Sequence, residues 1–413
     1  MRPKPIAPLT PRLPVIPEED FEVASNWIYE EDQFEKKLPS FVISDWGIDR
    51  FKGDAPEIEF LIEDILPCGQ PSLISSLGGI GKSYAMLDLA IRIAAGPGLV
   101  NAYCLGGRVV KQGKAVFITA EDSLAAIHRR IDLLITEDDK KKLDGNLYVV
   151  PLPDAGGHTA LLESKHGEMH MTTAWHSLFA QIHALGDVAF VCLDPLQTFI
   201  QGDINAAPEV AQTFWAAMSQ LCAETGATGM VSHHMRKEME IESAFAARMA
   251  TRGSSAIIDG ARWAYSFWPA PSGMRTSIEA AMQETYGPLD IICGAVVKSN
   301  DIGMTDERVF LRDPNSGLLL DCTPMVEDAI ESRRTLSREQ FVEAIGLIND
   351  RWDIGQPFSR AVQSDRFLGK WLCGKYDIDM PAAKKYIKEW LDKGYLVQEF
   401  HTTLRMKGLR GNT

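Results

Sequence analysis

The octet from Ser76 to Ser83 is the feature that most narrows what this chain can fold into, because it reads Ser-Leu-Gly-Gly-Ile-Gly-Lys-Ser. An apolar run precedes it at residues 71–75, and a helical pattern follows at 84–95. A strand, a glycine-rich turn and a helix that opens with Lys-Ser form a pocket for a nucleoside triphosphate, since backbone N–H groups of the turn surround phosphate oxygens. We therefore expect ATP and Mg²⁺ as cofactors.

Part of the octet is expected to hold the nucleotide directly; these residues are Gly78, Gly79, Ile80, Gly81, Lys82 and Ser83. Lys82 supplies a charge to the β- and γ-phosphates, and the Ser83 hydroxyl is placed to ligate Mg²⁺. One position departs from the GxxxxGK[ST] pattern, because Ser76 stands where the first glycine is expected. A glycine turn at the start of an ordinary helix is the alternative interpretation.

The composition is that of a soluble globular protein, with 413 residues, 45% hydrophobic and 24% charged. This length favours two or three domains. No N-terminal segment resembles a signal peptide, and no run approaches the roughly 20 apolar residues of a membrane span. The seven cysteines are scattered without a CxxC pair. We expect reduced thiols, a cytoplasmic location and no contact with a membrane.

The net charge of −14 argues against a protein that coats DNA over its whole surface. Its distribution is uneven, because residues 380–413 hold seven Lys/Arg against three Asp/Glu. This local excess is compatible with a nucleic-acid contact confined to one module, and equally with a solvated tail.

The chain divides into five predicted parts. Residues 1–18 carry six prolines, which favours a flexible arm that could dock a partner. Residues 19–66 form an N-terminal extension. Strand-like runs alternate with helical patterns over 67–322, which predicts an α/β core with a mostly parallel sheet and an antiparallel edge. A polar stretch at 323–334 is typical of a linker, and 335–413 form a separate small domain.

The boundaries of the elements can be predicted as well. Strands are expected at 71–76, 115–120, 147–151, 188–193, 227–232, 261–268 and 291–297. Helices are expected at 82–95, 123–135, 172–185 and 208–225, then at roughly 336–349, 359–376 and 380–393.

Two strands of the core end in acidic residues. The run 116–120 leads to Glu121, and the run 188–193 leads to Asp194. A carboxylate at the carboxyl end of a strand beside the nucleotide strand can polarise an attacking water, and a second can hold hydrated Mg²⁺. Each carboxylate could instead merely cap the helix that follows.

His233 and His234 follow the apolar run 230–232. A histidine there can hydrogen-bond a γ-phosphate, and we expect His234 to do so while His233 packs. No further ligand at zinc-like spacing accompanies them. Beyond a loop at 235–249 without apolar periodicity, Arg252 stands at a glycine hinge and could reach a neighbouring subunit's γ-phosphate as an arginine finger. An intrachain salt bridge is the alternative.

In their order and spacing these motifs resemble the RepA-like hexameric helicases of plasmids and mobile elements, within the RecA/DnaB-type ATPases. The resemblance covers about residues 60–315 and rests on 77–83, 120–122, 126–130, 193–196, 225–226, 233–234, 252–255, Asp259, 262–263 and 297–300. Serine in place of the first glycine is also tolerated in that family.

The resemblance implies a RecA-like core with assigned catalytic roles. The matching residues are Glu121 as catalytic base, His234 as sensor, Arg252 as finger acting in trans and Arg130 as a second arginine near the site, with Ser83 and Asp194 on the Mg²⁺ side. Lys298 matches a lysine that DnaB-like relatives place next to an arginine finger. Asn300 replaces that arginine here, which shifts the finger role toward Arg252.

The resemblance also implies a homo-oligomer, a hexamer, that grips single-stranded DNA in a central channel. The loops expected to face that channel are residues 197–208 and 235–250. They offer basic groups for phosphates and aromatic rings for stacking, namely Arg236, Lys237, Arg248, Phe199 and Phe245.

Two regions fall outside the resemblance. Helices followed by a two-stranded turn suggest a winged helix-turn-helix at 335–413, which could place Lys384, Lys385 and Lys388 on DNA phosphates or dock a replication partner. The segment 154–171 contains three histidines and is interpreted as a mobile surface loop, with a metal site involving Glu163 or Glu168 as the alternative.

Two functions of different class follow. The first is an ATP-dependent DNA helicase that serves replication of a plasmid, phage or integrated element. The second is a DNA-binding regulator or partner-recruiting protein that uses ATP only as a switch and does not unwind DNA. A small-molecule kinase fits less well, because the histidine pair and the Arg-Gly-Ser-Ser segment have no role there.

Overall fold

The computed structural model describes residues 43–96, 102–165, 168–202, 204, 207–236, 241–251, 255–332 and 335–412. These residues form two compact units. One contains the described residues up to Phe267 together with Ala295–Asp306, and the other contains Trp268–Gly294 and the residues from Glu307 on. The predicted arm at 1–18 lies outside the described residues, and the five-part division stays a prediction.

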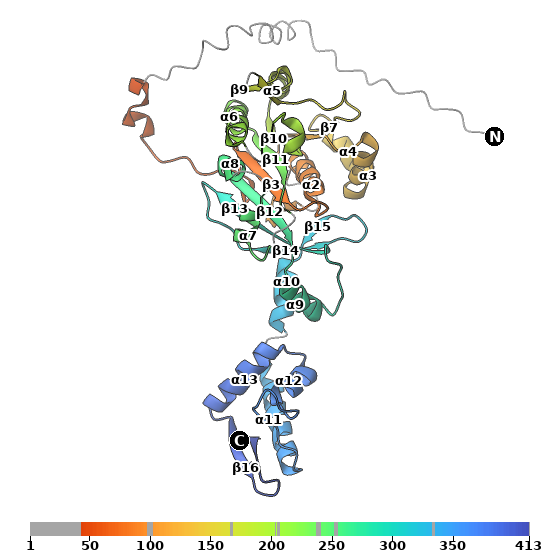
Figure 1. The fold of residues 1–413 in the computed structure, drawn as a ribbon, viewed down its shortest axis with the longest axis vertical. Helices are drawn as coiled ribbons and strands as arrows, with labels where there is room; N and C mark the ends of the chain where they lie inside the picture. Colours follow the sequence, from red (N-terminus) through yellow and green to blue (C-terminus); the bar gives the residue numbers. More distant parts are fainter. Residues whose placement is uncertain are drawn as a thin grey trace, which may run out of the picture. The chain divides into compact units, whose positions relative to one another are not determined.

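A nine-stranded sheet in the order β15-β14-β13-β12-β3-β11-β10-β6-β7 dominates the fold (Figure 1). Its central strand β3 (Pro71–Ser76) pairs in parallel with β11 (Thr228–His234) and β12 (Trp263–Pro269). Next to β11 the parallel pairing continues through β10 (Val188–Asp194) and β6 (Lys114–Thr119). The carboxyl ends of these five neighbouring strands thus meet at one edge.

The two margins of the sheet differ. β7 (Leu147–Pro151) extends the parallel part beyond β6. On the other side β14 (Arg308–Arg312) pairs antiparallel with β13 (Ile291–Ser299) and with β15 (Leu319–Asp321). The predicted α/β core with a mostly parallel sheet and an antiparallel edge is therefore confirmed.

Four helices match the predicted set closely. They are α2 (Lys82–Ala95), α3 (Leu124–Leu134), α5 (Thr173–Leu185) and α6 (Pro208–Thr225). Nearly every residue of α2 is buried, because this helix packs against β6 and β10 of the sheet. Burial on all sides fixes the helix that opens with the P-loop lysine.

Further short elements complete the core unit and its surroundings. The helices are α4 (Glu137–Leu143), α8 (Ser255–Gly260), α9 (Ser272–Met282), η2 (Ile43–Trp46), η3 (Ile48–Phe51) and η4 (Leu196–Phe199). Two small antiparallel pairs are β1 (Phe60–Ile62) with β2 (Leu66–Pro67), and β4 (Tyr103–Cys104) with β5 (Gly107–Arg108).

Three segments expected to lack regular structure contain elements. The predicted surface loop at 154–171 includes the antiparallel hairpin of β8 (Leu162–Lys165) and β9 (Glu168–Met171). The loop after β11 contains α7 (Ala244–Ala250), whose first turn is capped by Ser243, the acceptor for Ala246 N–H at 3.3 Å. The predicted linker forms α10 (Thr323–Ser332), which contacts α9 and β14.

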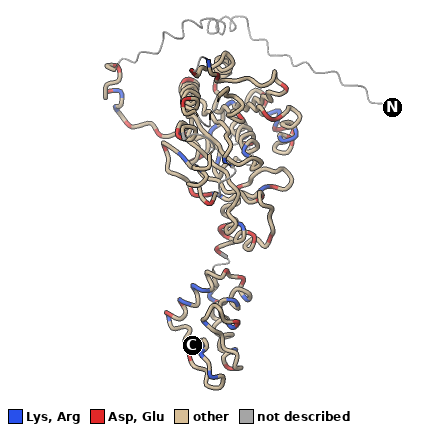
Figure 2. Tube along the Cα trace, in the orientation of Figure 1, with Lys and Arg blue, Asp and Glu red and all other residues tan. Residues whose placement is uncertain are grey.

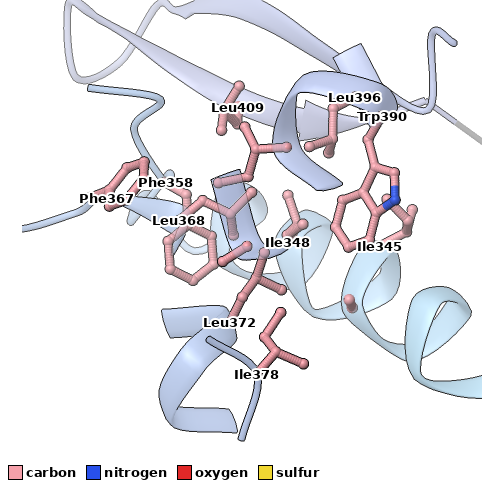
Figure 3. Packing of buried hydrophobic residues seen from close by; sticks show 13 residues of the cluster. Ile345, Ile348, Phe358, Phe367, Leu368, Leu372, Ile378, Trp390, Leu396 and Leu409 are labelled. Atoms are coloured by element: carbon pink, nitrogen blue, oxygen red, sulfur yellow. The ribbon is translucent and has the colours of Figure 1, made fainter. Parts of the chain in front are cut away.

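The C-terminal module consists of three helices and a hairpin. Its elements are α11 (Arg338–Asp353), α12 (Leu368–Tyr376), α13 (Met380–Asp392), β16 (Leu396–His401) and β17 (Met406–Gly411). Leu368, Trp390 and Leu409 meet in a core drawn from all these parts (Figure 3). The helix predicted at 359–376 begins nine residues late, because residues 359 and 367 pair as a short bridge. The winged helix-turn-helix assignment stays a prediction.

Candidate nucleotide site

The octet forms a turn between the end of β3 and the start of α2. Gly79 has φ 80° and Gly81 has φ 111°, a region that side chains with a Cβ rarely adopt. A Cβ added at Gly78 or Gly79 would meet no heavy atom within 4 Å, so the backbone here borders open space. An open turn of this kind at a helix N-terminus can admit phosphate oxygens.

Lys82 lies at the centre of this region and is only 6% exposed. Burial lowers the pKa of its ammonium group, while the carboxylates of Asp194 and Glu121 act in the opposite direction. Its Nζ lies 3.4 Å from Nδ1 of His234, the last residue of β11. The lysine of the helix and the histidine of the neighbouring strand therefore share one site, where a phosphate would satisfy both.

Asp194 ends β10 and is 1% exposed. Its Oδ1 accepts a hydrogen bond from the Ser232 hydroxyl of β11, whereas no described residue donates one to its buried Oδ2. A buried carboxylate oxygen without a donor is costly, and a hydrated cation is a partner that removes this cost. Asp194 therefore fits the Mg²⁺ that accompanies a bound triphosphate, and the role of the Ser83 hydroxyl beside it stays a prediction.

The small number of protein ligands at the site also matches the way in which Mg²⁺ is usually bound. No cluster of three or more His, Cys, Asp or Glu side chains that could cage a metal occurs in the described part of the chain. Mg²⁺ is usually held by one or two protein oxygens together with phosphates and waters. The alternative of a metal site with Glu163 or Glu168 stays a prediction, because His166, one of its histidines, lies outside the described residues, while β8 and β9 place Glu163 opposite His170.

Glu121 follows β6 by two residues and is exposed. Its position beside β10 is fixed by the backbone, because Ala120 N–H donates to the Asp194 carbonyl at 2.8 Å. The carboxylate lies close enough to Lys82 to act on the charge of that residue. Since the side chain is exposed, the direction of its carboxylate depends on how residues 121–123 are held.

Arg130 of α3 holds the segment next to Glu121. Its Nη1 donates to Oδ2 of Asp122, and the two side chains are 33% and 18% exposed. The Arg130 carbonyl also accepts a hydrogen bond from the Tyr84 hydroxyl of α2 at 3.4 Å. The pair joins the strand end that carries Glu121 to the helix that follows, and this partner of Arg130 was missed by sequence reasoning.

Comparison with known proteins agrees with this geometry. Residues 37–240 match the model of a family described as AAA domain (AAA_25). This part of the chain, just under half of its length, is similar to the P-loop ATPase domain of that family. Among solved structures, flagellar accessory protein FlaH from Methanocaldococcus jannaschii aligns with 13% identity and a TM-score of 0.37, over 62% of this chain and 90% of that one. A second solved structure, the ATPase domain of another protein, aligns with 12% identity and a TM-score of 0.39, over 61% of this chain and 84% of that one.

The helices and the cysteines can also be compared with what membrane-spanning and disulfide-bonded proteins require. None of the helices in the described ranges combines the length and apolarity that a membrane crossing needs. All seven cysteines of the chain are free thiols, and four of them are buried.

A hydroxyl network connects the P-loop strand of the ATPase domain to the segment before Arg252. The Ser75 hydroxyl of β3 lies 2.8 Å from the Ser266 hydroxyl of β12 and 3.3 Å from the Thr251 hydroxyl. All three side chains are buried. Sequence reasoning did not single out these residues, since serine and threonine in apolar strands give no signal of their own.

The residues expected to serve a neighbouring subunit are only partly described. Arg252 and Lys237 lie outside the described residues. Lys298 donates through Nζ to the carbonyls of Asp259 and Ala261, at the end of α8. Its side chain is therefore engaged within its own chain, and its comparison with the lysine beside an arginine finger loses support.

The groups expected to contact single-stranded DNA differ in exposure. Phe199 is 2% exposed, so the expectation that it stacks on a base is wrong, because η4 turns its ring into the core. Phe245 is 73% exposed on α7. Arg236 is exposed, and Arg248 is paired with Asp259 at 3.2 Å. The exposed candidates therefore lie on the loop after β11.

The Arg130–Asp122 pair gives a testable prediction. Arg130→Ala should lower ATP turnover about 10- to 100-fold while nucleotide affinity changes little, because the loop that carries Glu121 loses its anchor. Asp122→Asn should have a similar effect, and the double variant should be no worse than either single one. Steady-state turnover and nucleotide affinity of the three variants check this. Additive losses would mean that the two residues do not act as a pair.

Proposed function

We propose that this chain is an ATP-dependent DNA helicase of the RepA-like type, acting in replication of a mobile element. The single observation that carries the proposal is the 3.4 Å approach of Lys82 Nζ to His234 Nδ1, which joins the P-loop to the loop that follows β11. Loss of the γ-phosphate would change the charge next to Lys82 and His234. This change would alter the position of His234 and, through the chain that follows it, of the exposed Arg236 and Phe245. ATP hydrolysis and the binding of DNA would thereby be coupled.

Each residue of the candidate nucleotide site has a separate role in ATP hydrolysis. Glu121 accepts a proton from the attacking water and orients it, and Lys82 offsets the charge that grows on the phosphate oxygens. Asp194 and Ser83 hold the cation, which supplies charge neutralisation at the phosphates when bound. Ser232 fixes the Asp194 carboxylate, so that its free oxygen keeps one direction.

The ring is the second half of the proposal. A hexamer would bring Arg252 of one subunit to the nucleotide of the next, where an arginine finger stabilises the transition state. The segment after β11, with the exposed Arg236 and Phe245 and with Lys237 and Arg248, would contact single-stranded DNA in the channel. The proline-rich arm and the C-terminal module remain available for a replication partner.

An arginine finger that acts on the neighbouring subunit predicts that two inactive variants restore each other's activity when they are mixed. Arg252→Ala should lower turnover about 10³-fold or more while ATP binding stays nearly intact. Mixing this variant with Lys82→Ala subunits should restore part of the activity, because some interfaces then pair an intact P-loop with an intact Arg252. Turnover of the mixture against each variant alone measures this. The assignment of Arg252 as a finger would be contradicted by a mixture that is no more active than its components. It would also be contradicted if Arg252→Ala lost ATP binding as strongly as turnover.

Strand separation of a tailed duplex tests the proposed function itself. The unaltered chain should release the tailed strand in the presence of ATP and Mg²⁺ and should fail with a non-hydrolysable analogue. Nucleotide-dependent binding to DNA without turnover or unwinding would instead favour an ATP-switched regulator.

A further inference from the structure

Helix α13 of the C-terminal module presents two chemically different faces. Ala383, Ile387 and Trp390 are buried in the module core, where Figure 3 shows the Trp390 ring. The other face carries Lys384, Lys385 and Lys388, all exposed. No carboxylate of a described residue lies within salt-bridge distance of these three ammonium groups. The helix therefore displays three lysines without an ion pair on one side, with Glu389 and Asp392 on the same helix one turn beyond Lys385 and Lys388.

Charge is segregated across the module. Residues 380–413 hold seven Lys/Arg against three Asp/Glu. Helix α11 has the opposite balance, with four acidic and two basic residues, Glu339, Glu343, Asp350, Asp353, Arg338 and Arg351. Figure 2 shows the blue of Lys and Arg along the part of the trace that Figure 1 labels α13. On a chain of net charge −14, such a separation concentrates positive potential on α13 and the β16–β17 hairpin.

The connection between α12 and α13 holds the basic helix in a fixed direction. Only residues 377–379 separate the two helices, and Asp377 has φ 54°, in the left-handed region. Asp379 caps α13, because its Oδ1 accepts the Ala382 N–H at 2.7 Å. Two helices joined by a three-residue turn form the arrangement in which the second helix can enter a DNA major groove.

Helix α13 by itself suits a duplex better than a single strand, whereas the neighbouring β16 carries the exposed ring of Phe400. Single strands are bound largely by stacking of bases on exposed aromatic rings. The two aromatic residues of α13 are not free for this, since Trp390 is buried and the Tyr386 hydroxyl accepts the Leu336 N–H at 2.8 Å. Lysines on a helix instead match the regular phosphates that flank a groove.

We propose that α13 and the β16–β17 hairpin form a binding site for duplex DNA, with Lys384, Lys385 and Lys388 on its phosphates. This site is separate from the ATPase site and does not depend on the proposed helicase activity. It would hold the enzyme on a duplex region while the ATPase domain acts on a strand.

The test measures binding of the full chain to a blunt 25-base-pair duplex by fluorescence anisotropy, in EDTA and without nucleotide. The variant replaces Lys384, Lys385 and Lys388 together by Gln. The matched control replaces Lys140, Lys141 and Lys142 of α4 by Gln, the same change of charge at three lysines that are each paired with an Asp or Glu. Circular dichroism and DNA-independent ATP turnover check that both variants are folded.

We expect the α13 variant to lose about 10- to 100-fold in affinity. The salt dependence of its binding should fall by about 2.7 in slope, or about 0.9 for each of the three phosphates that the lysines no longer neutralise. The α4 control should bind like the unaltered chain. The proposal is overturned by an unaltered chain that does not bind the duplex, by an equal loss in both variants, or by an α13 variant with unchanged affinity. Stronger binding to duplex RNA of the same sequence would also overturn it. A failure of this test leaves unwinding and ATP turnover, which are measured separately, unaffected.

Discussion

Replacing Lys82 by alanine is expected to abolish ATP turnover, with a loss of at least about 10²–10³-fold. The ammonium group is the one described cation that lies at the P-loop, the Asp194 carboxylate and His234 together. Its removal leaves the charge that develops on the phosphate oxygens without its nearest counter-charge, and leaves the buried Asp194 carboxylate less compensated. Nucleotide affinity should fall as well, because the same charge acts in the ground state.

The matched control for this variant is Lys141→Ala on α4. Lys141 is exposed and paired with Asp138, and it has no role in the pocket. Turnover measured with saturating Mg²⁺ should be unchanged in the control and lost in Lys82→Ala. A Lys82→Ala variant that retains more than about a tenth of the turnover would contradict the assignment of the octet as the triphosphate site.

Replacing Glu121 by glutamine should separate chemistry from binding. The amide keeps the shape of the side chain but cannot accept the proton, and loss of a general base costs about 10²–10⁴-fold in turnover. Nucleotide binding should be retained or become tighter, because a negative charge near the phosphates is removed. Turnover and affinity for a fluorescent ATP analogue measure the two effects independently.

Glu137→Gln on the exposed face of α4 serves as the control for this change of charge. The control should hydrolyse ATP at the normal rate. If Glu121→Gln hydrolyses ATP as fast as the unaltered chain, or if it loses nucleotide binding to the same extent as turnover, Glu121 is not the base.

Local sequence patterns predicted the core of the fold well where one signal dominates. The bounds of β3, β7, α2 and α6 agree with the prediction to the residue, because strong apolar runs, the Lys-Ser start and Gly226 after α6 mark them. The mostly parallel pairing of the sheet followed from the βαβ alternation, whereas the order of its strands was not predicted.

Other features depend on contacts between distant residues, which a single sequence does not display. Helix α10 looked like a polar linker, but its Val326 is buried. The ring of Phe199 was expected to be exposed in a loop, and tertiary packing buries it. The β8–β9 hairpin has no Asn-Gly or Asp-Gly turn signal to announce it.

In the candidate nucleotide site, too, residues with a local sequence signal could be predicted and residues that act through distant contacts could not. The octet, Glu121, Asp194 and His234 could be found from their places at strand ends, and their side chains gather as that rule predicts. The partners that hold them could not be found this way. Ser232 bonds to the Asp194 carboxylate, whereas Asp122 and Thr251 bond to the neighbouring Arg130 and Ser75, and these residue types are too common to stand out.

The most direct test of the central proposal is ATP turnover of the full chain with and without a single-stranded oligonucleotide. An ATP-driven DNA motor predicts Mg²⁺-dependent turnover that rises several-fold on addition of single-stranded DNA and disappears in Lys82→Ala. Turnover that is unaffected by single-stranded DNA at every concentration would contradict it.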